Sequence, residues 1–429
     1  MKTLSVLASL FGLFLLTACR APDANQRNEP EPSALMQTLQ EIDISGASNG
    51  IVDLPENSPS IFTDVFARYT KIMAPNGKPI HVLAQSGWTD EQIKKARNVL
   101  QFILTNAPGT QYGKDKSAIA NAMADRKAAL ILFNTEPDMR AALRGPLGSQ
   151  TDLSMQDLRA NECPAEGTED YMNHMTRDAS FEEIWHLVHD NGVKAVLPEM
   201  IAEMRAANDN AVRAGWHAWP EDEPDEHPNE YMGVLIDNFF DLWTVPPKLY
   251  EGRSIGPEEN PRGKSHFGRY FAGSRARMEH LDPRGYALVQ QFFPPWLTYT
   301  PELPEDFEGT FSLNYDESLA YTAKSQHLRN VALRGNKNAN LVGNDYDNVL
   351  TGNDGDNILT GRRGHDMIIG GEGEDLAVFS GLSGEYRILK DGEWAFVEDT
   401  RPERDGTDAC LGIEILRFRD KDVRLRSEL

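Results

Sequence analysis

A nine-residue repeat decides the fold near the C-terminus, where residues 333–378 read LRGNKNANLVGNDYDNVLTGNDGDNILTGRRGHDMIIGGEGEDLAV. Glycine stands at positions 343, 352, 361 and 370, and an apolar residue follows seven places after each of these glycines. Nine glycines and no proline fall between residues 333 and 375, which suits tight turns that join very short strands. A short, fixed period of this kind indicates stacked units that bury one apolar stripe together. The sequence therefore predicts a solenoid of short strands.

The sixth place of each turn carries a side chain with an oxygen atom, namely Asn340, Asn348, Asn357, Asp366 and Asp375. Together with the glycines, this pattern resembles the repeats-in-toxin (hemolysin-type) family, whose motif is Gly-Gly-x-Gly-x-Asp-x-apolar-x. The resemblance covers about residues 330–425 and implies a parallel β-roll closed by a β-stranded cap, which we expect to occupy residues 325–429. In that family, calcium lies between successive turns and is held by sixth-place carboxylates and glycine carbonyl groups.

The resemblance implies bound calcium, which prefers six to eight oxygen ligands. Only residues 370–375 match the motif fully; the turn at residues 361–366 lacks the second glycine, and the three turns before it carry Asn at the sixth place. We therefore expect one good site and one or two weaker sites. A glycine-rich solenoid that binds no metal is the alternative. The candidate calcium ligands are Asn348, Asn357, Asp366, Gly370, Glu372, Glu374 and Asp375.

The composition of the 429-residue chain limits its partners and its metal chemistry. A formal net charge of −23 argues against binding to nucleic acid, because the phosphate backbone would be repelled. Three cysteines are too few for a disulfide-built scaffold or a cysteine-rich zinc module. A metal ion must then be held by oxygen or imidazole ligands. Cys163 and Cys410 could pair in an oxidising compartment, although nothing in the sequence indicates that they meet.

The N-terminus has the features of an export signal. Met1-Lys2 precedes an apolar run over residues 4–16, which is too short to span a bilayer but suits a secretory signal. The tetrad Leu16-Thr17-Ala18-Cys19 then resembles the lipobox of bacterial lipoproteins. It implies a signal peptide over residues 1–18, lipidation of Cys19, and an outer-membrane lipoprotein that faces the periplasm or the cell surface. The alternative is an ordinary secretory signal with an incidental cysteine, and residues 19–47 are expected to form a polar tether.

Residues 48–320 are expected to form an α-rich domain with a minor sheet. A capping box at Thr89 and Gln92 begins a helix of apolar periodicity. Short apolar runs at residues 80–84 and 129–133 are the strand candidates, and the acidic, proline-containing residues 220–230 are expected to form a solvated loop. Further helices are expected at about residues 115–128, 181–190, 198–214, 230–243 and 284–293.

The expected helix at residues 181–190 carries a candidate metal site. Glu182 and His186 are spaced i and i+4, so both project from one face of the helix. The segment from Glu182 to His186 resembles the His-Glu-x-x-His helix of zincin metallopeptidases, with glutamate in place of the first histidine. The resemblance implies that Glu182, His186 and Glu230 hold zinc and that Glu183 is the general base. The expected fold class is therefore a zincin-like α+β domain followed by a parallel β-roll with a β-stranded cap.

Simpler interpretations of these residues remain open. Glu183 could complete a capping box with Ser180, His186 could be an ordinary core or surface histidine, and His174 is a substitute ligand. Two functions are therefore compared. The first is a membrane-anchored, calcium-binding surface protein whose helical domain binds or scaffolds without chemistry. The second is an active zinc-dependent peptidase that acts on a protein or peptide substrate.

Overall fold

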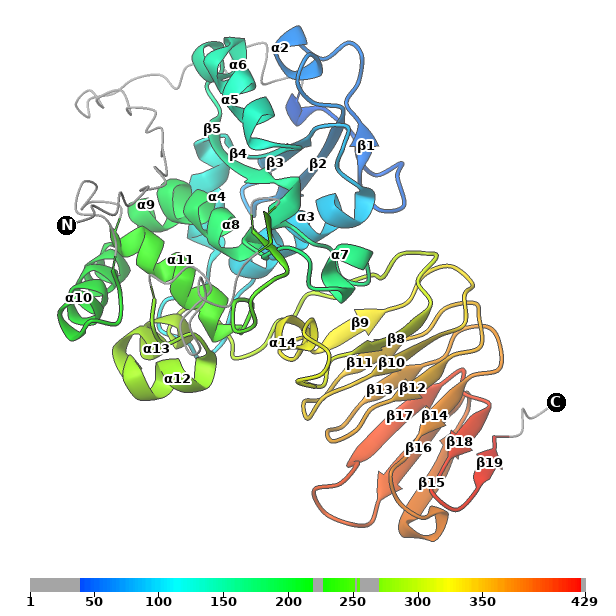
Figure 1. Cartoon of the computed structure of the whole chain (residues 1–429). Helices are drawn as coiled ribbons and strands as arrows, with labels where there is room; N and C mark the ends of the chain where they lie inside the picture. The colour runs from blue at the N-terminus through cyan, green and yellow to red at the C-terminus, as the bar shows by residue number, and fades with distance from the viewer. Residues whose placement is uncertain (1–38, 219–226, 251–252, 255–269, 426–429) are drawn as a thin grey trace, which may run out of the picture.

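The computed structural model describes residues 39–218, 227–250, 253–254 and 270–425. An N-terminal domain of helices around a sheet is followed by a stack of short strands that extends away from it (Figure 1). The signal peptide, Cys19 and most of the expected tether lie outside the described residues. Within the described residues, no helix is long and apolar enough to cross a membrane.

The N-terminal domain is built on a five-stranded sheet rather than a minor one. Its strands lie in chain order, with β1 paired antiparallel to β2, β2 antiparallel to β3, and the last three strands parallel. The expected strand candidates are the two fully buried strands β3 and β4. The other three strands were missed because they are short or carry polar residues. The five strands are β1 (Val52–Asp53), β2 (Arg68–Met73), β3 (Pro79–Ala84), β4 (Ala128–Phe133) and β5 (Ser154–Arg159).

Both faces of this sheet are covered. Along β4, Leu130 and Leu132 pack into a large core with α3 and α8, whereas Ile131 and Phe133 face a smaller core on the opposite side. Leu39 is fully buried in that smaller core, and its carbonyl oxygen accepts a hydrogen bond from the Tyr69 hydroxyl at 3.1 Å. Residues 39–47 therefore belong to the folded domain, which corrects the expectation that the tether extends to residue 47.

The expected helices are present with small shifts of their ends. Thr89 forms the predicted capping box with Gln92 at the start of α3. Helix α11 begins at His227 with Pro228 in its first turn, so residues 227–230 are helical, contrary to the expected loop. Residues 220–226 of that loop lie outside the described residues. The expected helices are α3 (Asp90–Leu104), α4 (Ser117–Asp125), α8 (Ser180–Val188), α10 (Pro198–Ala214), α11 (His227–Phe239) and α13 (Pro283–Gln290).

Shorter elements complete the N-terminal domain and its junction with the stacked strands. Helices α2, α5 and α6 contact the smaller core. A short π-helix, η2, continues α8. Their bounds are α2 (Ser60–Thr63), α5 (Glu136–Arg144), α6 (Pro146–Gln150), η1 (Ala160–Glu162), α7 (Glu169–Met172), η2 (His189–Val193), α9 (Lys194–Val196), β6 (Leu249–Tyr250), β7 (Arg253–Ser254), α12 (Arg275–Leu281) and α14 (Thr322–Ser325).

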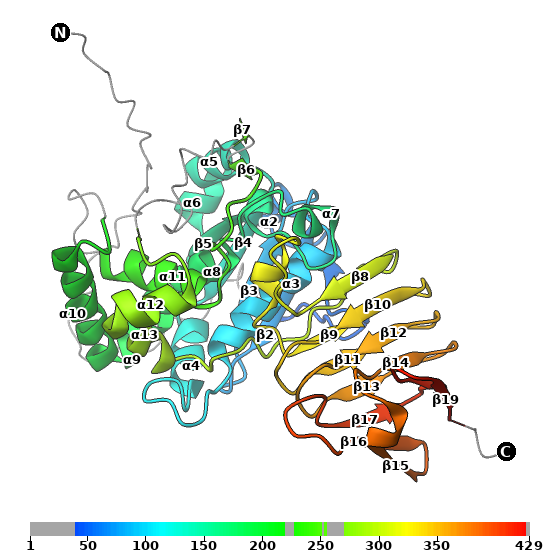
Figure 2. The same ribbon diagram turned by 60° about the horizontal axis from the view of Figure 1, so that its bottom comes forward.

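The repeats form the expected parallel β-roll. Successive turns alternate between two sheets, so strands 18 residues apart pair, as Leu341 with Leu359 and Leu350 with Ile368. These side chains are fully buried. Figure 2 shows the two rows of strands stacked along the roll. The roll strands are β8 (Gly309–Ser312), β9 (Asn330–Ala332), β10 (Ala339–Val342), β11 (Val349–Thr351), β12 (Ile358–Thr360), β13 (Met367–Ile369) and β14 (Leu376–Val378).

The two ends of the roll differ from its middle. Strand β8 pairs with β10, so the roll begins at residue 309 instead of the expected 325. At the other end, β17 and β18 extend the two parallel sheets and antiparallel strands close them. The cap consists of η3 (Ser383–Glu385), β15 (Tyr386–Asp391), β16 (Trp394–Asp399), β17 (Thr407–Leu411), β18 (Ile415–Arg417) and β19 (Asp422–Arg424).

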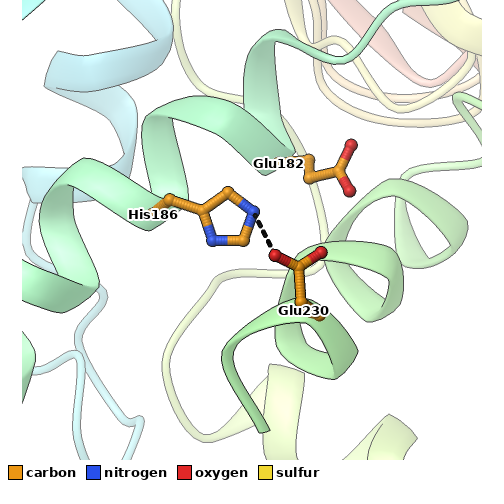
Figure 3. Close-up of side chains that lie close together, drawn as sticks. All are labelled: Glu182, His186 and Glu230. Atoms are coloured by element: carbon orange, nitrogen blue, oxygen red, sulfur yellow. Dashed lines mark ion pairs between the residues drawn. The ribbon is translucent and has the colours of Figure 1, made fainter. Parts of the chain in front are cut away.

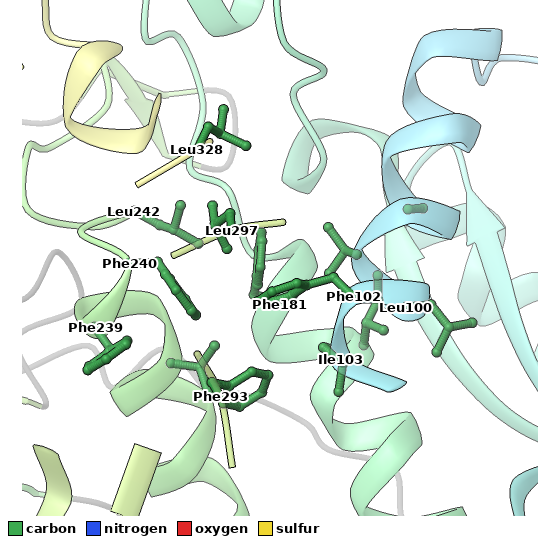
Figure 4. Packing of buried hydrophobic residues seen from close by; sticks show 14 of the residues in the cluster. Leu100, Phe102, Ile103, Phe181, Phe239, Phe240, Leu242, Phe293, Leu297 and Leu328 are labelled. Atoms are coloured by element: carbon green, nitrogen blue, oxygen red, sulfur yellow. The ribbon is translucent and has the colours of Figure 1, made fainter. Parts of the chain in front are cut away.

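One continuous apolar core joins the N-terminal domain to the roll. Phe102 of α3 and Phe181 of α8 meet Phe240 and Phe293, and Leu328 reaches the same cluster from the start of the roll (Figure 4). Cys163 and Cys410 are both buried and unpaired, so they do not form the disulfide that the sequence left open.

Candidate metal centres

Sixth-place side chains of the roll form two columns that run across the parallel strands. In the first column, Asp366 Oδ1 accepts a hydrogen bond from the Asn348 backbone N–H at 2.8 Å. In the second column, Asp375 Oδ1 accepts one from the Asn357 N–H at the same distance. The Oδ1 atom of each aspartate thus ties its turn to the turn before it in the same sheet.

The two aspartates have the properties of cation ligands. Asp366 and Asp375 are buried, and the Oδ2 atom of each lacks a hydrogen-bond partner. Burial raises the pKa of each carboxyl group to about 7, so a negative charge at these positions is destabilised without a nearby cation. Calcium would satisfy both the unpartnered oxygens and the charge, and hard oxygen ligands suit this ion.

The sixth-place side chains Asn348 and Asn357 make a different set of hydrogen bonds. The Asn348 side-chain amide donates to Asn344 Oδ1 at 2.9 Å and to the Arg329 carbonyl oxygen at 3.2 Å. The Asn357 amide makes the equivalent bonds to Asn353 Oδ1 and to the Ala339 carbonyl oxygen. The amide nitrogen of each asparagine is therefore already hydrogen-bonded to its own turn and to the preceding turn of the same sheet, unlike the Oδ2 atoms of Asp366 and Asp375.

Two other expected calcium ligands lie apart from the columns. The side chains of Glu372 and Glu374 are exposed, and Glu374 Oε1 accepts a hydrogen bond from Arg424 Nη2 at 2.6 Å. Both follow Gly370 in the complete repeat, where the glycines allow a close stack. A Cβ atom on Gly370 would collide with Asp375 Oδ2 and with the carbonyl oxygen of Gly412. Gly370 therefore keeps open the space in which two candidate ligand oxygens meet.

A second candidate centre lies between helices α8 and α11. Glu182, His186 and Glu230 each offer a ligand atom, and these atoms all lie within 4.8 Å of one another. His186 Nε2 is 3.7 Å from Glu230 Oε1, and Glu182 points toward the same place from one turn earlier in α8 (Figure 3). The structure therefore brings together the three residues that the zincin resemblance implied as zinc ligands.

The electrostatics of this centre favour a cation. Burial alone would lower the pKa of His186, but the carboxylates of Glu230, Glu183 and Glu182 outweigh it and raise the pKa to about 9. Burial also raises the pKa of Glu182, against the opposing effect of Arg177. One imidazole and two carboxylates form a donor set that zinc accepts.

The packing of α11 against α8 holds the carboxylate of Glu182 in place. Gly233 lies one turn after Glu230, and a Cβ atom at this position would be only 3.0 Å from Glu182 Cγ. Behind Glu182, Arg177 Nη1 lies 3.5 Å from Oε2, and Arg177 Nη2 donates to Glu162 Oε1 at 2.5 Å. Neither Gly233 nor Arg177 was identified from the sequence, because neither residue type indicates a metal site by itself.

Glu183 does not form the capping box that the sequence left open. The N-cap residue of α8 is Ala179, and Asp178 Oδ1 accepts the hydrogen bonds from the Ser180 backbone N–H and hydroxyl. The Glu183 carboxylate instead accepts a hydrogen bond at 2.9 Å from Gln156 Nε2 on β5. Burial and the neighbouring carboxylate of Glu182 raise the pKa of Glu183 well above its usual range.

Two other histidines near this centre, His174 and His189, have hydrogen-bond partners elsewhere. His174 Nε2 lies 2.8 Å from the Val245 carbonyl oxygen, and His189 Nδ1 lies 2.8 Å from Asp190 Oδ1. Within the residues that the structure describes, the only group of three or more such side chains close enough to share an ion is Glu182, His186 and Glu230. His174 is therefore not brought to the centre as a substitute ligand.

Comparison with known proteins identifies the repeats. Residues 342–377 match the family model of the RTX calcium-binding nonapeptide repeat, in four copies. Residues 342–377 of the roll are RTX calcium-binding repeats. Among solved structures, the chain is similar to the extracellular lipase LipA from Serratia marcescens, with 18% identity over 24% of this chain and 21% of the lipase and a TM-score of 0.13. No curated protein matches the chain.

Proposed function

We propose that the protein is a calcium-binding surface lipoprotein whose N-terminal domain holds a second metal ion, zinc, between α8 and α11. The observation that carries the zinc proposal is the convergence of the Glu182, His186 and Glu230 ligand atoms within 4.8 Å. All three residues are buried at the contact between two helices, so little side-chain entropy is lost when the ion binds.

Metal analysis of the full-length protein tests this site. After dialysis against micromolar zinc in the presence of calcium, we expect about one zinc ion per chain, and His186→Ala and Glu230→Gln should each lower that content strongly. His280→Ala is a matched control, because His280 is an exposed histidine on α12. A zinc content well below one per chain in the folded wild-type protein would reject the proposal.

A metal-dependent peptidase is the second candidate function, and the position of Glu183 favours it. The residue follows Glu182 directly in α8, and its carboxylate contacts β5, one of the two edge strands of the five-stranded sheet among the described residues. An edge strand can bind an extended peptide by main-chain hydrogen bonds, which would bring the substrate close to Glu183. Zinc would supply Lewis-acid polarisation of the scissile carbonyl, and Glu183 would accept a proton from water.

Glu183→Gln separates catalysis from metal binding. The amide cannot accept the proton, so hydrolysis of an unstructured protein such as casein should fall by a factor of about 100 or more, while zinc content and folding are retained. A zinc-loaded wild-type protein that hydrolyses neither casein nor a peptide library would leave the metal site standing and reject the peptidase.

We also propose that a lipid on Cys19 anchors the protein in the outer membrane. Support comes from the sequence of residues 16–19 alone, because this segment lies outside the described residues. Stable anchoring takes more than one acyl chain, which lipidation at an N-terminal cysteine provides. The wild-type protein should partition into detergent, and Cys19→Ser should not. Continued partitioning of that variant would reject the anchor.

A further inference from the structure

The cap continues both sixth-place columns beyond the last repeat. In the first column, Asp408 Oδ1 accepts a hydrogen bond from the Asp366 N–H at 3.0 Å, as Asp366 itself does from Asn348. Strands β13 and β17 pair in parallel, with Ile368 opposite Cys410. Asp408 therefore takes the sixth place of a further turn. It lies 42 residues after Asp366, its neighbour in the column, whereas Asp366 lies 18 residues after Asn348.

The second column ends in the same way. Glu414 Oε2 accepts a hydrogen bond from the Asp375 N–H at 2.8 Å, across a separation of 39 residues. The backbone also repeats, because the Gly370 N–H donates to the Leu411 carbonyl oxygen as the Gly352 N–H donates to that of Ile369. Gly412, with φ of 62°, then takes the place of the first glycine of a further turn. The cap thus supplies both a carbonyl oxygen and a carboxylate above the complete repeat.

Two carboxylate oxygens without hydrogen-bond partners lie in the last two repeats, next to the cap. Asp366 is 1% exposed and Asp375 is 0% exposed, and the Oδ2 atom of each has no hydrogen-bond partner. Asp375 Oδ2 and the Gly412 carbonyl oxygen both lie against Gly370. In the part of the chain that the structure describes, no arginine or lysine forms an ion pair with Asp366, Asp375, Asp408 or Glu414. These carboxylates therefore have no ion-pair partner among the described residues.

We propose that the cap completes the last two calcium sites of the roll, with Asp408 closing the site at Asp366, and Gly412 and Glu414 closing the site at Asp375. Both sites include residues outside the matched repeats, and the amide-closed asparagine turns hold no ion. The full-length protein then binds two calcium ions. The cap acts as a ligand donor as well as a cover for the last strands.

Calcium titration of the full-length protein by calorimetry tests this assignment. We expect two ions for the wild type, and Asp408→Asn and Glu414→Gln should each weaken one site about tenfold or remove it, because calcium affinity follows the charge of its ligands. Both variants keep an oxygen that can accept the backbone hydrogen bond. Asp391→Asn and Glu393→Gln, which change exposed carboxylates in the β15–β16 turn, are matched controls and should leave both sites unchanged.

The double variant gives the decisive result. Loss of both sites from a protein with an unchanged circular dichroism spectrum supports the proposal, and two sites of wild-type affinity in that protein overturn it. If Asp408→Asn prevents folding, Glu414→Gln carries the same test, since Glu414 is only partly buried. The measurement involves neither zinc nor catalysis, so its outcome is independent of the N-terminal metal centre.

Discussion

His327 Nε2 lies 2.8 Å from Asp241 Oδ2, and this buried contact joins the start of the roll to the turn that ends α11. On the α11 side, Asp241 Oδ1 also accepts hydrogen bonds from the Arg275 N–H and the Thr244 hydroxyl. On the roll side, the Asn344 amide donates to the carbonyl oxygens of the residues just before and after His327. The helix that carries Glu230 is therefore tied to the first turns of the calcium-binding roll.

Removal of this contact should lower the stability of the whole chain. His327→Ala leaves one buried carboxylate oxygen of Asp241 without its partner, at a cost of roughly 1–3 kcal/mol in the free energy of unfolding. Urea denaturation followed by tryptophan fluorescence measures the difference. His280→Ala, at an exposed position, should stay within about 0.5 kcal/mol of the wild type. Equal stability of the two variants would show that the contact contributes nothing.

The periodic parts of this fold were predictable because local spacing determines them. The nine-residue period fixed the parallel roll and its buried eighth-place residues, and the spacing of Glu182 and His186 placed both on one face of α8. The pairing with Glu230 could be inferred only through a family resemblance. The strands β1, β2 and β5 were missed because their positions depend on tertiary pairing with β3 and β4, not on their own apolar pattern.

Residues whose position in the roll depends on pairing between strands far apart in the sequence could not be found from local spacing. Asp408 and Glu414 lie 42 and 39 residues from the aspartates that they contact, and a hairpin interrupts the period between them. The hydrogen bonding of the asparagine turns could not be predicted either. A sixth-place Asn offers an oxygen in the sequence, but its amide group is already hydrogen-bonded to neighbouring turns in the structure.

Gly233→Ala should weaken zinc binding without unfolding the protein. The added Cβ atom would lie 3.0 Å from Glu182 Cγ, so Glu182 must shift by a few tenths of an ångström, which disturbs its fit with His186 and Glu230. Alanine also favours the helical state by about 1 kcal/mol, which offsets the cost of that shift. Competition with a zinc chelator should show an affinity at least several-fold lower. Gly384→Ala is the control, because a Cβ atom there meets nothing within 4 Å.

Asp375→Asn should change stability in opposite directions with and without calcium. In chelator, the variant should be at least as stable as the wild type, because the amide carries no charge to bury and resembles the hydrogen-bonded Asn357. In saturating calcium the wild type should be more stable, since an ion at a hundred times its dissociation constant contributes about 2.7 kcal/mol. Thermal unfolding of both proteins, in chelator and in calcium, shows whether the order of their stabilities reverses. A variant that gains as much from calcium as the wild type would contradict the role of Asp375.

His81 should make the N-terminal domain sensitive to acid. Its Nδ1 atom lies 2.9 Å from the Tyr69 hydroxyl, and its buried Nε2 atom has no hydrogen-bond partner. Burial, with a smaller effect of Lys71, lowers the pKa of His81 to about 4 in the folded chain, against 6.5 for an ordinary histidine. The folded state therefore binds fewer protons than the unfolded state between these two values, and its stability falls as the pH decreases through that window.

Comparison of the wild type with His81→Gln isolates this contribution from that of the carboxylates. The free energy of unfolding of the wild type, relative to the variant, should be constant above about pH 7, fall by up to about 1.4 kcal/mol per pH unit as the pH decreases below 6.5, and level off below pH 4. The total change is on the order of 3 kcal/mol. His280→Gln, at an exposed position, should follow the wild-type curve. Parallel curves for the wild type and His81→Gln between pH 7 and 4 would show that His81 is protonated as readily in the folded chain as in the unfolded one.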